Sequence, residues 1–249
     1  QIQKYLDDFK PDNKEGNLGG LFRIKHKNHF LVVDIGKPPM KKFSKSYQSG
    51  PLSFEYFLDG IKIITNSGFG YHISKKIELL SRLTACQSTL SINDTSITKF
   101  EKNEITSKIF GNSILNSFKS FDFSSKNESD LIGCTASNNG YEKKFGCIHK
   151  REIYLDKKNN YIKGTDHIFK AKDGYPIRYA FRFHINPDLS VVKTMSGNSA
   201  LIQITKNKSL IFTINEENLD IEKSIFLGEK KIIDSACITI SGNLVNKNK

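Results

Sequence analysis

The sequence predicts an all-β protein, a large antiparallel β-sandwich with few or no helices. Short segments in which apolar and polar residues alternate recur along the 249-residue chain, as expected of strands that bury one face. Turn residues such as Asn-Gly, Asp-Gly and Asn-Pro-Asp separate these segments. Helical periodicity is nearly absent, and Ile77–Leu83 is the best helical candidate, for one or two turns only.

The strongest local signal is a hairpin formed by the segments Leu52–Leu58 and Ile61–Asn66. Asp59 and Gly60 join them, and this dipeptide favours a tight hairpin turn because both residues tolerate positive φ. A third strand is expected at Ser88–Asn93. The rest of the chain is organised around this central stretch.

The alternation also predicts strands on both sides of the central stretch. Upstream, Leu21–His26 and Phe30–Ile35 form a second predicted hairpin, and the two prolines of Lys37–Lys42 break the sheet after it. Downstream, the predicted strands are Ile105–Phe110, Ile114–Phe123, Asp130–Ala136, Phe145–Leu155, Tyr161–Phe169, Ile177–Ile185, Ser199–Thr205, Leu210–Ile214, Leu219–Leu227 and Ile232–Ser241. Many short strands at this spacing are typical of an antiparallel sandwich.

The chain divides into a linker, one large domain and a short tail. Residues 1–20 are polar and rich in turn residues, so we expect a linker there. We expect a single sandwich domain over residues 21–243 and a frayed tail over residues 244–249. The sequence starts at Gln1 rather than Met, which we interpret as a piece of a longer protein. No apolar run is long enough to cross a bilayer, so a membrane span is not expected.

The formal net charge is +12, from 38 Lys and Arg against 26 Asp and Glu. Such a balance favours polyanionic partners, although a broad compositional bias towards Lys, Asn and Ile gives the same charge without a binding patch. Nucleic acid is not an expected partner, because the sequence lacks Trp and the interleaved basic and aromatic surface of single-strand binders.

The four cysteines do not form a metal or redox motif. None of Cys86, Cys134, Cys147 and Cys237 belongs to a C-x-x-C pair. Cys134 and Cys147 are candidates for a disulfide in an oxidising compartment, and buried free thiols are the alternative.

Several longer motifs occur in register along the chain. They are Asp34-x-Gly-x-Pro-Pro39, G-x-L-S-F-E…G…I-x-N-x-G from Gly50, R-x-T-A-x-x-S-T-L-x-I-x-D-T-S from Arg82, Asn139-Gly-Tyr…Phe145-Gly-x-x-His149-x-Arg151 and Phe181-Arg-Phe-His-x-x-Pro187. In this order they resemble the C-terminal domain of heparinase II/III-like proteins, which are polysaccharide lyases and their relatives. The resemblance covers most of the chain.

The resemblance implies a supersandwich-like β domain that follows an N-terminal helical toroid, from which residues 1–20 would lead. It implies two partners, an acidic (uronate-containing) polysaccharide and the protein's own toroid. In β-elimination a base takes the C5 proton, the neighbouring carboxylate is neutralised and an acid protonates the leaving oxygen. The family carries most of this apparatus on the toroid, so we assign no catalytic residue to this chain. We expect a bacterial periplasmic or cell-envelope location, with the cytoplasm as the alternative.

The chain departs from the family's pattern at three positions. Gln48 and Gln87 stand where members carry histidine, and Asn66 stands where zinc-binding members carry aspartate. Neutral amides are poor zinc ligands, and Gln87 has no proton to transfer at neutral pH. We therefore expect no zinc and no other cofactor. We expect the three amides to face one shared cleft and to hydrogen-bond sugar hydroxyls or a carboxylate.

Three charged or titratable residues complete the expected substrate-binding set. Arg82 suits a bidentate contact to a uronate carboxylate, and a surface ion pair is the alternative. Arg182 and His184 alternate with two phenylalanines, so they share one face of a strand. That face borders the cleft in one interpretation, whereas His184 is a satisfied structural histidine in the other.

Four more residues have both a functional and a structural interpretation. His149 and Arg151 show the same alternation as Arg182 and His184, with the same two interpretations. Tyr141 follows Asn-Gly and is a candidate base if its pKa is lowered, or else it covers a sheet edge. Glu55 either supports the cleft or is solvated.

We therefore expect the C-terminal domain of a polysaccharide lyase that helps to bind an acidic polysaccharide for β-elimination. The alternative is a catalytically degenerate module that binds carbohydrate or has only a structural role.

Overall fold

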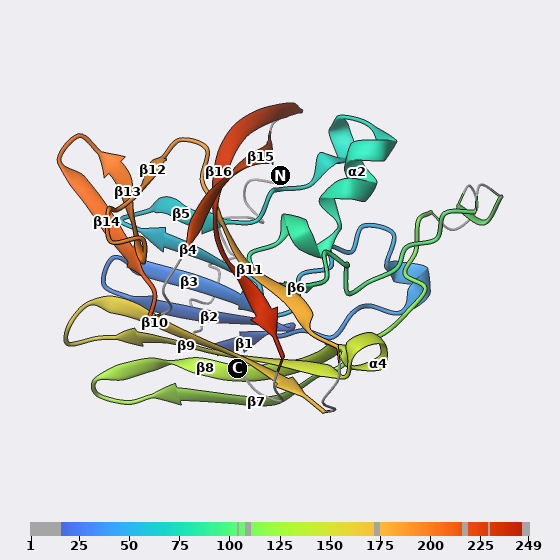
Figure 1. Cartoon of the computed structure of the whole chain (residues 1–249), viewed down its shortest axis with the longest axis horizontal. Coiled ribbons are helices and arrows are strands. Elements are labelled where there is room, and N and C mark those ends of the chain that lie inside the picture. The colour runs from blue at the N-terminus through green and yellow to red at the C-terminus, as the bar shows by residue number, and fades with distance from the viewer. Residues whose placement is uncertain are drawn as a thin grey trace, which may run out of the picture.

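The computed structural model of the chain describes residues 16–103, 105–107, 111–171, 175–215, 219–228 and 230–245. Strands dominate the molecule (Figure 1), and the strands of every ladder run antiparallel, which confirms the predicted antiparallel all-β fold. Most of the predicted linker, residues 1–15, lies outside the described residues, and the first described residues of that range form a short strand. Residues 246–249 of the predicted tail also lie outside them.

The larger sheet has nine strands in the order β1-β2-β3-β4-β5-β11-β16-β15, with β6 paired to β11. These strands are β1 (Gly16–Leu18), β2 (Leu21–His26), β3 (His29–Asp34), β4 (Phe54–Leu58), β5 (Ile61–Thr65), β6 (Leu90–Ile92), β11 (Ile177–Ile185), β15 (Asp220–Gly228) and β16 (Lys231–Leu244). The chain lays down β1 to β5 as consecutive neighbours. It then leaves the sheet, forms a second sheet, and returns with β11 to pair with β5 and β6.

The second sheet has four strands in the order β10-β9-β8-β7, and a third, smaller sheet has the order β12-β13-β14. The strands of the second sheet are β7 (Ser120–Asn127), β8 (Leu131–Tyr141), β9 (Cys147–Asp156) and β10 (Tyr161–Lys170). Those of the third are β12 (Ser190–Lys193), β13 (Ser199–Thr205) and β14 (Lys208–Thr213). Each of these two smaller sheets is thus a meander of hairpins, which is the arrangement that short turns between consecutive strands produce.

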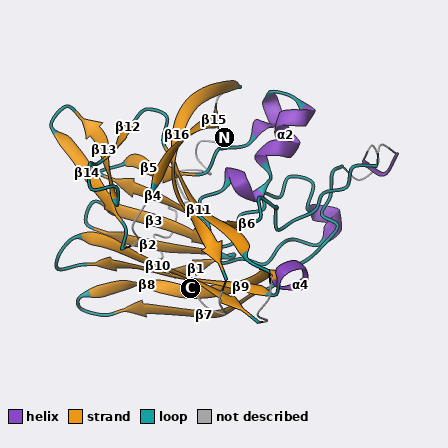
Figure 2. Ribbon diagram, viewed as in Figure 1, coloured by secondary structure: helices purple, strands orange, loops and turns teal. Residues whose placement is uncertain are grey.

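Helical segments are short, and Figure 2 shows them on one side of the molecule, away from the tips of the long hairpins. They are η1 (Lys41–Phe43), η2 (Gly70–His72), α2 (Lys75–Ser81), η3 (Thr84–Cys86) and α4 (Glu142–Phe145). Ser74 caps α2 by accepting a 3.1 Å hydrogen bond from the backbone N–H of Ile77, so the helix begins just ahead of the predicted segment. No helix among the described residues is long and apolar enough to cross a bilayer.

The central hairpin has the predicted turn. Asp59 and Gly60 have φ values of 53° and 77°, and such a pair of positive φ angles matches the twist of the two flanking strands. Asn28 of the neighbouring hairpin turn donates a 2.9 Å hydrogen bond to the Asp59 carboxylate, which ties the two turns together.

Two predicted strands differ from the structure. Residues 105–107 of the predicted strand Ile105–Phe110 are helical, because the Asn103 side chain accepts hydrogen bonds from the N–H groups of Ile105 and Thr106 and caps a turn there. Residue 104 and residues 108–110 lie outside the described residues. In the predicted strand Ile114–Phe123, regular pairing starts only at Ser120.

The two large sheets bury their facing sides in one core. Phe22 and Leu31 of the nine-stranded sheet belong to the same buried cluster as Ile132 and Ile153 of the four-stranded sheet. Phe22 also meets Phe123 of β7 edge to face, with ring centroids 5.6 Å apart. The molecule is therefore a sandwich, as predicted, and each sheet keeps one face outside this core.

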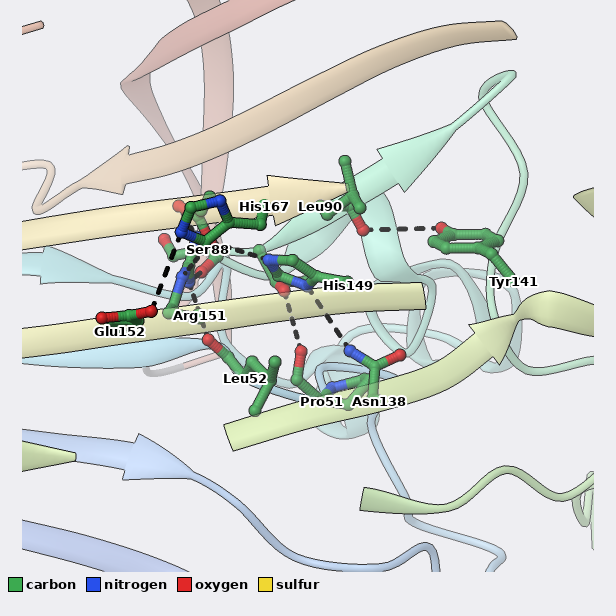
Figure 3. Close-up of polar contacts among 12 residues, drawn as sticks. Pro51, Leu52, Ser88, Leu90, Asn138, Tyr141, His149, Arg151, Glu152 and His167 are labelled. Carbon is green, nitrogen blue, oxygen red and sulfur yellow. Dashed lines mark hydrogen bonds and ion pairs between the residues drawn. The ribbon is translucent and has the colours of Figure 1, made fainter. Parts of the chain in front are cut away.

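β9 carries charged side chains at core positions. Every second residue of β9 is buried, and His149 and Arg151 occupy two of these buried positions. The Arg151 guanidinium donates hydrogen bonds to the backbone oxygens of Leu52 and Ser88 at 2.7 and 2.9 Å, which lie across the sandwich (Figure 3). It also lies over the rings of Phe54 and Phe183. These contacts select the structural interpretation of Arg151.

Asp166 of β10 completes this buried network. Its carboxylate accepts hydrogen bonds from Nε and Nη2 of Arg151, at 2.7 and 3.0 Å. It also accepts a 2.7 Å hydrogen bond from Nε2 of His149. Burial acts to raise the pKa of Asp166, but Arg151 and His149 outweigh burial and hold this pKa well below its ordinary value. Burial lowers the pKa of His149, so its ring is neutral and accepts a hydrogen bond at Nδ1 from Asn138.

We predict that Asp166→Asn lowers the free energy of unfolding by about 3–5 kcal/mol, because it leaves the buried Arg151 charge without its counter-ion. Urea unfolding at neutral pH measures this change. Glu152→Gln is the matched control, since Glu152 lies on the opposite face of β9 and pairs with Lys150, both side chains being partly exposed. The control should change the stability by less than about 0.5 kcal/mol. A loss below about 1 kcal/mol for Asp166→Asn would contradict the prediction.

Candidate functional site

A groove of about 380 Å³ lies on the outer face of the nine-stranded sheet, the face opposite the sandwich core. The outward residues of β3 and β4 form its floor, among them Phe30, Asp34, Glu55 and Phe57. Segments that precede β4 and follow β5 and η3 form its wall. The groove therefore belongs to the central stretch around the Asp59-Gly60 hairpin.

The wall brings together the three amides at the strand ends. Gln48, Asn66 and Gln87 all line the groove, together with Gly50. Gly50 is required there, because a Cβ at this position would lie 3.0 Å from Cγ of Gln87 and 2.9 Å from Oγ of Ser53. The shared cleft expected from the sequence is present, while the part that these residues play in binding stays a prediction.

Hydrogen bonds fix the orientation of two of the amides. Oδ1 of Asn66 accepts a 2.8 Å hydrogen bond from the backbone N–H of Ser88, and Nε2 of Gln87 donates a 3.1 Å hydrogen bond to the backbone oxygen of Ser81. Gln87 is only 2% exposed. Nδ2 of Asn66 and Oε1 of Gln87 make no hydrogen bond to another described residue. One donor and one acceptor thus remain for a ligand.

Two carboxylates lie on the floor beside the amides. Oδ1 of Asp34 accepts a 3.0 Å hydrogen bond from the backbone N–H of Gly36, and burial raises the pKa of Asp34 to about 6. Glu55 accepts a 2.8 Å hydrogen bond from Nζ of Lys62. In the sequence, Asp34 stands out only as part of a motif. Its place at the end of a strand, two residues before Gly36, is the signal that could have placed it in the groove.

Arg82 does not line the groove. Its side chain is 1% exposed, and the guanidinium donates 2.8 Å hydrogen bonds to the backbone oxygens of Tyr47 and Ser44. The guanidinium carbon also lies 4.1 Å from the ring centre of Phe100. Arg82 therefore holds the loop that carries Gln48 in place, and we do not propose it as a carboxylate partner.

His184 lines a separate pocket of about 350 Å³, together with Ser67, Cys86 and Ser224. Nε2 of His184 donates a 3.0 Å hydrogen bond to the backbone oxygen of Ala85, and Nδ1 accepts a 3.0 Å hydrogen bond from Oγ of Ser224. Burial lowers the pKa of His184 to about 4, so the ring is neutral at physiological pH. These contacts fit the structural interpretation of His184.

Arg182 also lies apart from the groove. It donates a hydrogen bond to Oγ of Ser91, and its guanidinium lies 3.6 Å from the carboxylate of Asp94. Tyr141 is buried and donates a 2.7 Å hydrogen bond to the backbone oxygen of Thr95. Burial raises the pKa of Tyr141 above its ordinary value, which is the wrong direction for a base. All four cysteines are free thiols, so Cys134 and Cys147 form no disulfide.

Comparisons with known proteins identify the family. Residues 10–248 match the model of the heparinase II/III-like, C-terminal family. The chain belongs to this family. Its fold resembles that of the heparan sulfate lyase HepC from Pedobacter heparinus, with a TM-score of 0.74 and 16% identity over 100% of this chain and 37% of that one. It also resembles heparinase III, with a TM-score of 0.68 and 14% identity over 95% of this chain and 36% of that one.

One curated relative is not named as a lyase. The chain is 24% identical to FtsZ-localized protein C from Caulobacter vibrioides (strain NA1000 / CB15N) over 186 residues, which cover 71% of this chain and 31% of that protein. The chain therefore spans about a third of the length of each of these proteins.

The zinc site of some heparinase II/III-like proteins does not fit the residues present here. Gln48, Asn66 and Gln87 offer neutral amide groups where zinc takes imidazole, thiolate or carboxylate ligands. The part of the chain that the structure describes holds no group of three His, Cys, Asp or Glu residues arranged to bind a metal. We derive no step through zinc.

We predict that Asp34→Asn stabilises the domain increasingly as the pH rises. The raised folded-state pKa means that the folded protein retains a proton on Asp34 that the unfolded chain loses above about pH 4. Wild-type stability therefore falls between about pH 4 and pH 7, and Asn removes this fall while it still accepts from Gly36. The gain at neutral pH should be about 1–3 kcal/mol.

Urea unfolding at several pH values measures the difference between the two proteins. Asp188→Asn is the control, because Asp188 is an exposed carboxylate outside the groove. A difference between Asp34→Asn and wild type that does not change with pH would contradict the prediction.

Proposed function

We propose that this heparinase II/III-like C-terminal domain binds a polysaccharide in the groove. One observation carries the proposal: three amides, Gln48, Asn66 and Gln87, converge on the same groove above a floor that includes Phe30 and Phe57. Amides beside aromatic rings are the combination that sugars require, because a sugar presents hydroxyl groups at its edge and C–H groups on its faces.

The orientation of the amides supports this proposal. A sugar hydroxyl both donates and accepts a hydrogen bond. Nδ2 of Asn66 supplies a donor and Oε1 of Gln87 supplies an acceptor, since their other amide atoms are bonded to the backbone. A donor and an acceptor that face the groove in this way are satisfied by a ligand hydroxyl or by water, and they discriminate against apolar ligands.

We propose that the domain binds polysaccharide as part of a longer, multidomain protein. HepC is named as a heparan sulfate lyase and the other similar structure is named heparinase III, and this chain corresponds to about a third of each. An N-terminal helical domain of the full-length protein would form the opposite wall of the groove. We propose the bacterial periplasm or cell envelope as the location, because extracytoplasmic polysaccharide is found there.

A second candidate function is a part in β-elimination, and Asp34 favours it. A carboxyl group with a pKa of about 6 on the groove floor is suited to general acid or base chemistry near neutral pH. Against it stand the neutral amides at the positions where family members carry histidine, and the curated relative that is named for its localisation with FtsZ rather than for a lyase activity.

We predict that Gln48→Ala and Gln87→Ala each weaken binding of a uronate-containing oligosaccharide to the domain by about two- to tenfold, the effect of losing one hydrogen bond. Isothermal titration calorimetry measures the dissociation constants. Asn207→Ala is the control, because it removes an exposed amide from the turn between β13 and β14 and should leave binding unchanged. Equal affinity of all four proteins would place the binding site elsewhere.

The full-length protein distinguishes the two candidate functions. If the protein is a lyase that uses Asp34, it should release products with an unsaturated uronate, detected by their ultraviolet absorbance, and Asp34→Asn should abolish the release. If it only binds, wild type and variant should both bind the polysaccharide and release no such product.

A further inference from the structure

The floor of the groove changes in chemistry along its length. Strand register places Leu21 opposite Asp34, then Val32 between Arg23 and Glu55, and then Phe30 between Lys25 and Phe57. Successive rows on one face are about 7 Å apart, so the row of Phe30 lies about 13 Å from the row of Asp34. Such a distance accommodates more than one sugar ring.

Basic side chains surround the far row. The rings of Phe30 and Phe57 lie side by side, with centroids 5.6 Å apart. The Arg23 guanidinium carbon is 5.6 Å from the centre of Phe30, and Nζ of Lys62 is 5.1 Å from the centre of Phe57. Lys25 is exposed and directly opposite Phe30 in the register.

These basic side chains differ in whether they form an ion pair with a carboxylate. Lys62 is paired with Glu55, whereas Arg23 and Lys25 make no ion pair with a carboxylate of another described residue. The arginines nearer the amides are committed to protein groups: Arg82 to backbone oxygens and Arg151 to Asp166. Positive charge available to a ligand therefore lies at the Phe30–Phe57 end of the groove.

The amide end has the opposite character. Asp34 lies beside Gln48 and Gln87 on the groove. None of the described residues that line any part of the groove is Lys or Arg, and Arg23 and Lys25 flank only its Phe30–Phe57 end, from the neighbouring strand β2. An acidic sugar placed at this end would bring its carboxylate next to that of Asp34. A ring that presents only hydroxyl groups avoids this repulsion and matches the free donor and acceptor of Asn66 and Gln87.

We propose that the groove holds an oligosaccharide lengthwise, with an anionic ring over Phe30 and Phe57 and a ring without charge against the amides. The carboxylate or sulfate of the anionic ring contacts Arg23 and Lys25, and its C–H face packs on the two phenylalanines. This inference rests on the proposed function, because it assigns two subsites to the same groove.

The arrangement assigns the recognition of acidic groups to residues that the motifs do not include. Arg23 is half-buried against Phe30, and its guanidinium already lies over an aromatic ring, so little order is lost when a carboxylate binds. Each cation contributes a modest, salt-sensitive part of the affinity, since both are partly exposed.

The test compares two ligands that differ only in charge: a uronate-containing oligosaccharide and the same oligosaccharide with its carboxyl groups reduced to alcohols. Their affinities for the wild-type chain are measured by titration calorimetry at low and at physiological salt. We expect the acidic ligand to bind about five- to twentyfold more tightly at low salt and to lose most of this preference as salt is added.

The double variant Arg23→Gln/Lys25→Gln should bind both ligands with the affinity that wild type shows for the reduced one. The control Lys163→Gln/Lys206→Gln removes the same charge from exposed positions on β10 and in the turn between β13 and β14, and should behave as wild type. Phe57→Ala should weaken both ligands by a similar factor. Circular dichroism and urea unfolding verify that each variant is folded.

Four results would overturn the inference. If wild type binds both ligands equally, or if the double variant keeps the preference for the acidic ligand, the anionic ring lies elsewhere while the proposed function stands. If wild type binds neither ligand, the proposed function fails as well. If the domain binds sugar alone but loses binding in the full-length protein, another part of that protein occupies the Phe30–Phe57 row.

Discussion

One buried guanidinium sets the relation between the sandwich and the groove. Arg151 occupies a core position of β9, where its five N–H donors need acceptors that water does not supply. It finds them in Asp166 and in the backbone oxygens of Leu52 and Ser88. The last two belong to the segments that carry the groove wall, just beyond Gly50 and Gln87. Satisfying a charge in the core therefore also fixes the position of the amides at the surface.

The need of buried polar groups for hydrogen-bond partners also decides the roles of Arg82 and His184. Nε and Nη2 of Arg82 and both ring nitrogens of His184 bond to backbone oxygens or hydroxyls of the protein, and the two residues hold the loops around β6 in place. The wall of the groove carries uncharged amides, and its floor carries the carboxylates of Asp34 and Glu55. Among the described residues that line the groove, Asp34 has a pKa that burial raises to about 6. The proposed recognition therefore uses hydrogen bonds on a framework that buried charges hold in place.

Most of the fold could be predicted from the sequence, because the alternation of apolar and polar residues and the turn dipeptides are local signals. Alternation placed most strands, and Asp59-Gly60 placed the central turn, since period and turn chemistry depend on neighbouring residues only. The gathering of Gln48, Asn66 and Gln87 was also foreseen from their places at strand ends. The burial of Arg82 was not foreseen, because its partners Tyr47 and Ser44 are remote in sequence. Asp34 and the cations near Phe30 are brought to the groove by cross-strand register, which no single segment reveals.

The long excursion between β5 and β11 has a consequence for the order of assembly. Strands β1 to β5 are sequential neighbours, and the pairs β1–β2, β2–β3 and β4–β5 are joined by short turns, whereas β6 gains its partner only when β11 has been synthesised. The wall segment around Gln87 leads directly into β6, and Ser88 bonds to His184 of β11. The floor of the groove and the wall segments around Gln48 and Asn66 are therefore available early in synthesis, whereas the wall segment around Gln87 is fixed late. A nascent chain presents Phe30 and Phe57 before Gln87 is held beside them, which leaves this apolar face open during synthesis.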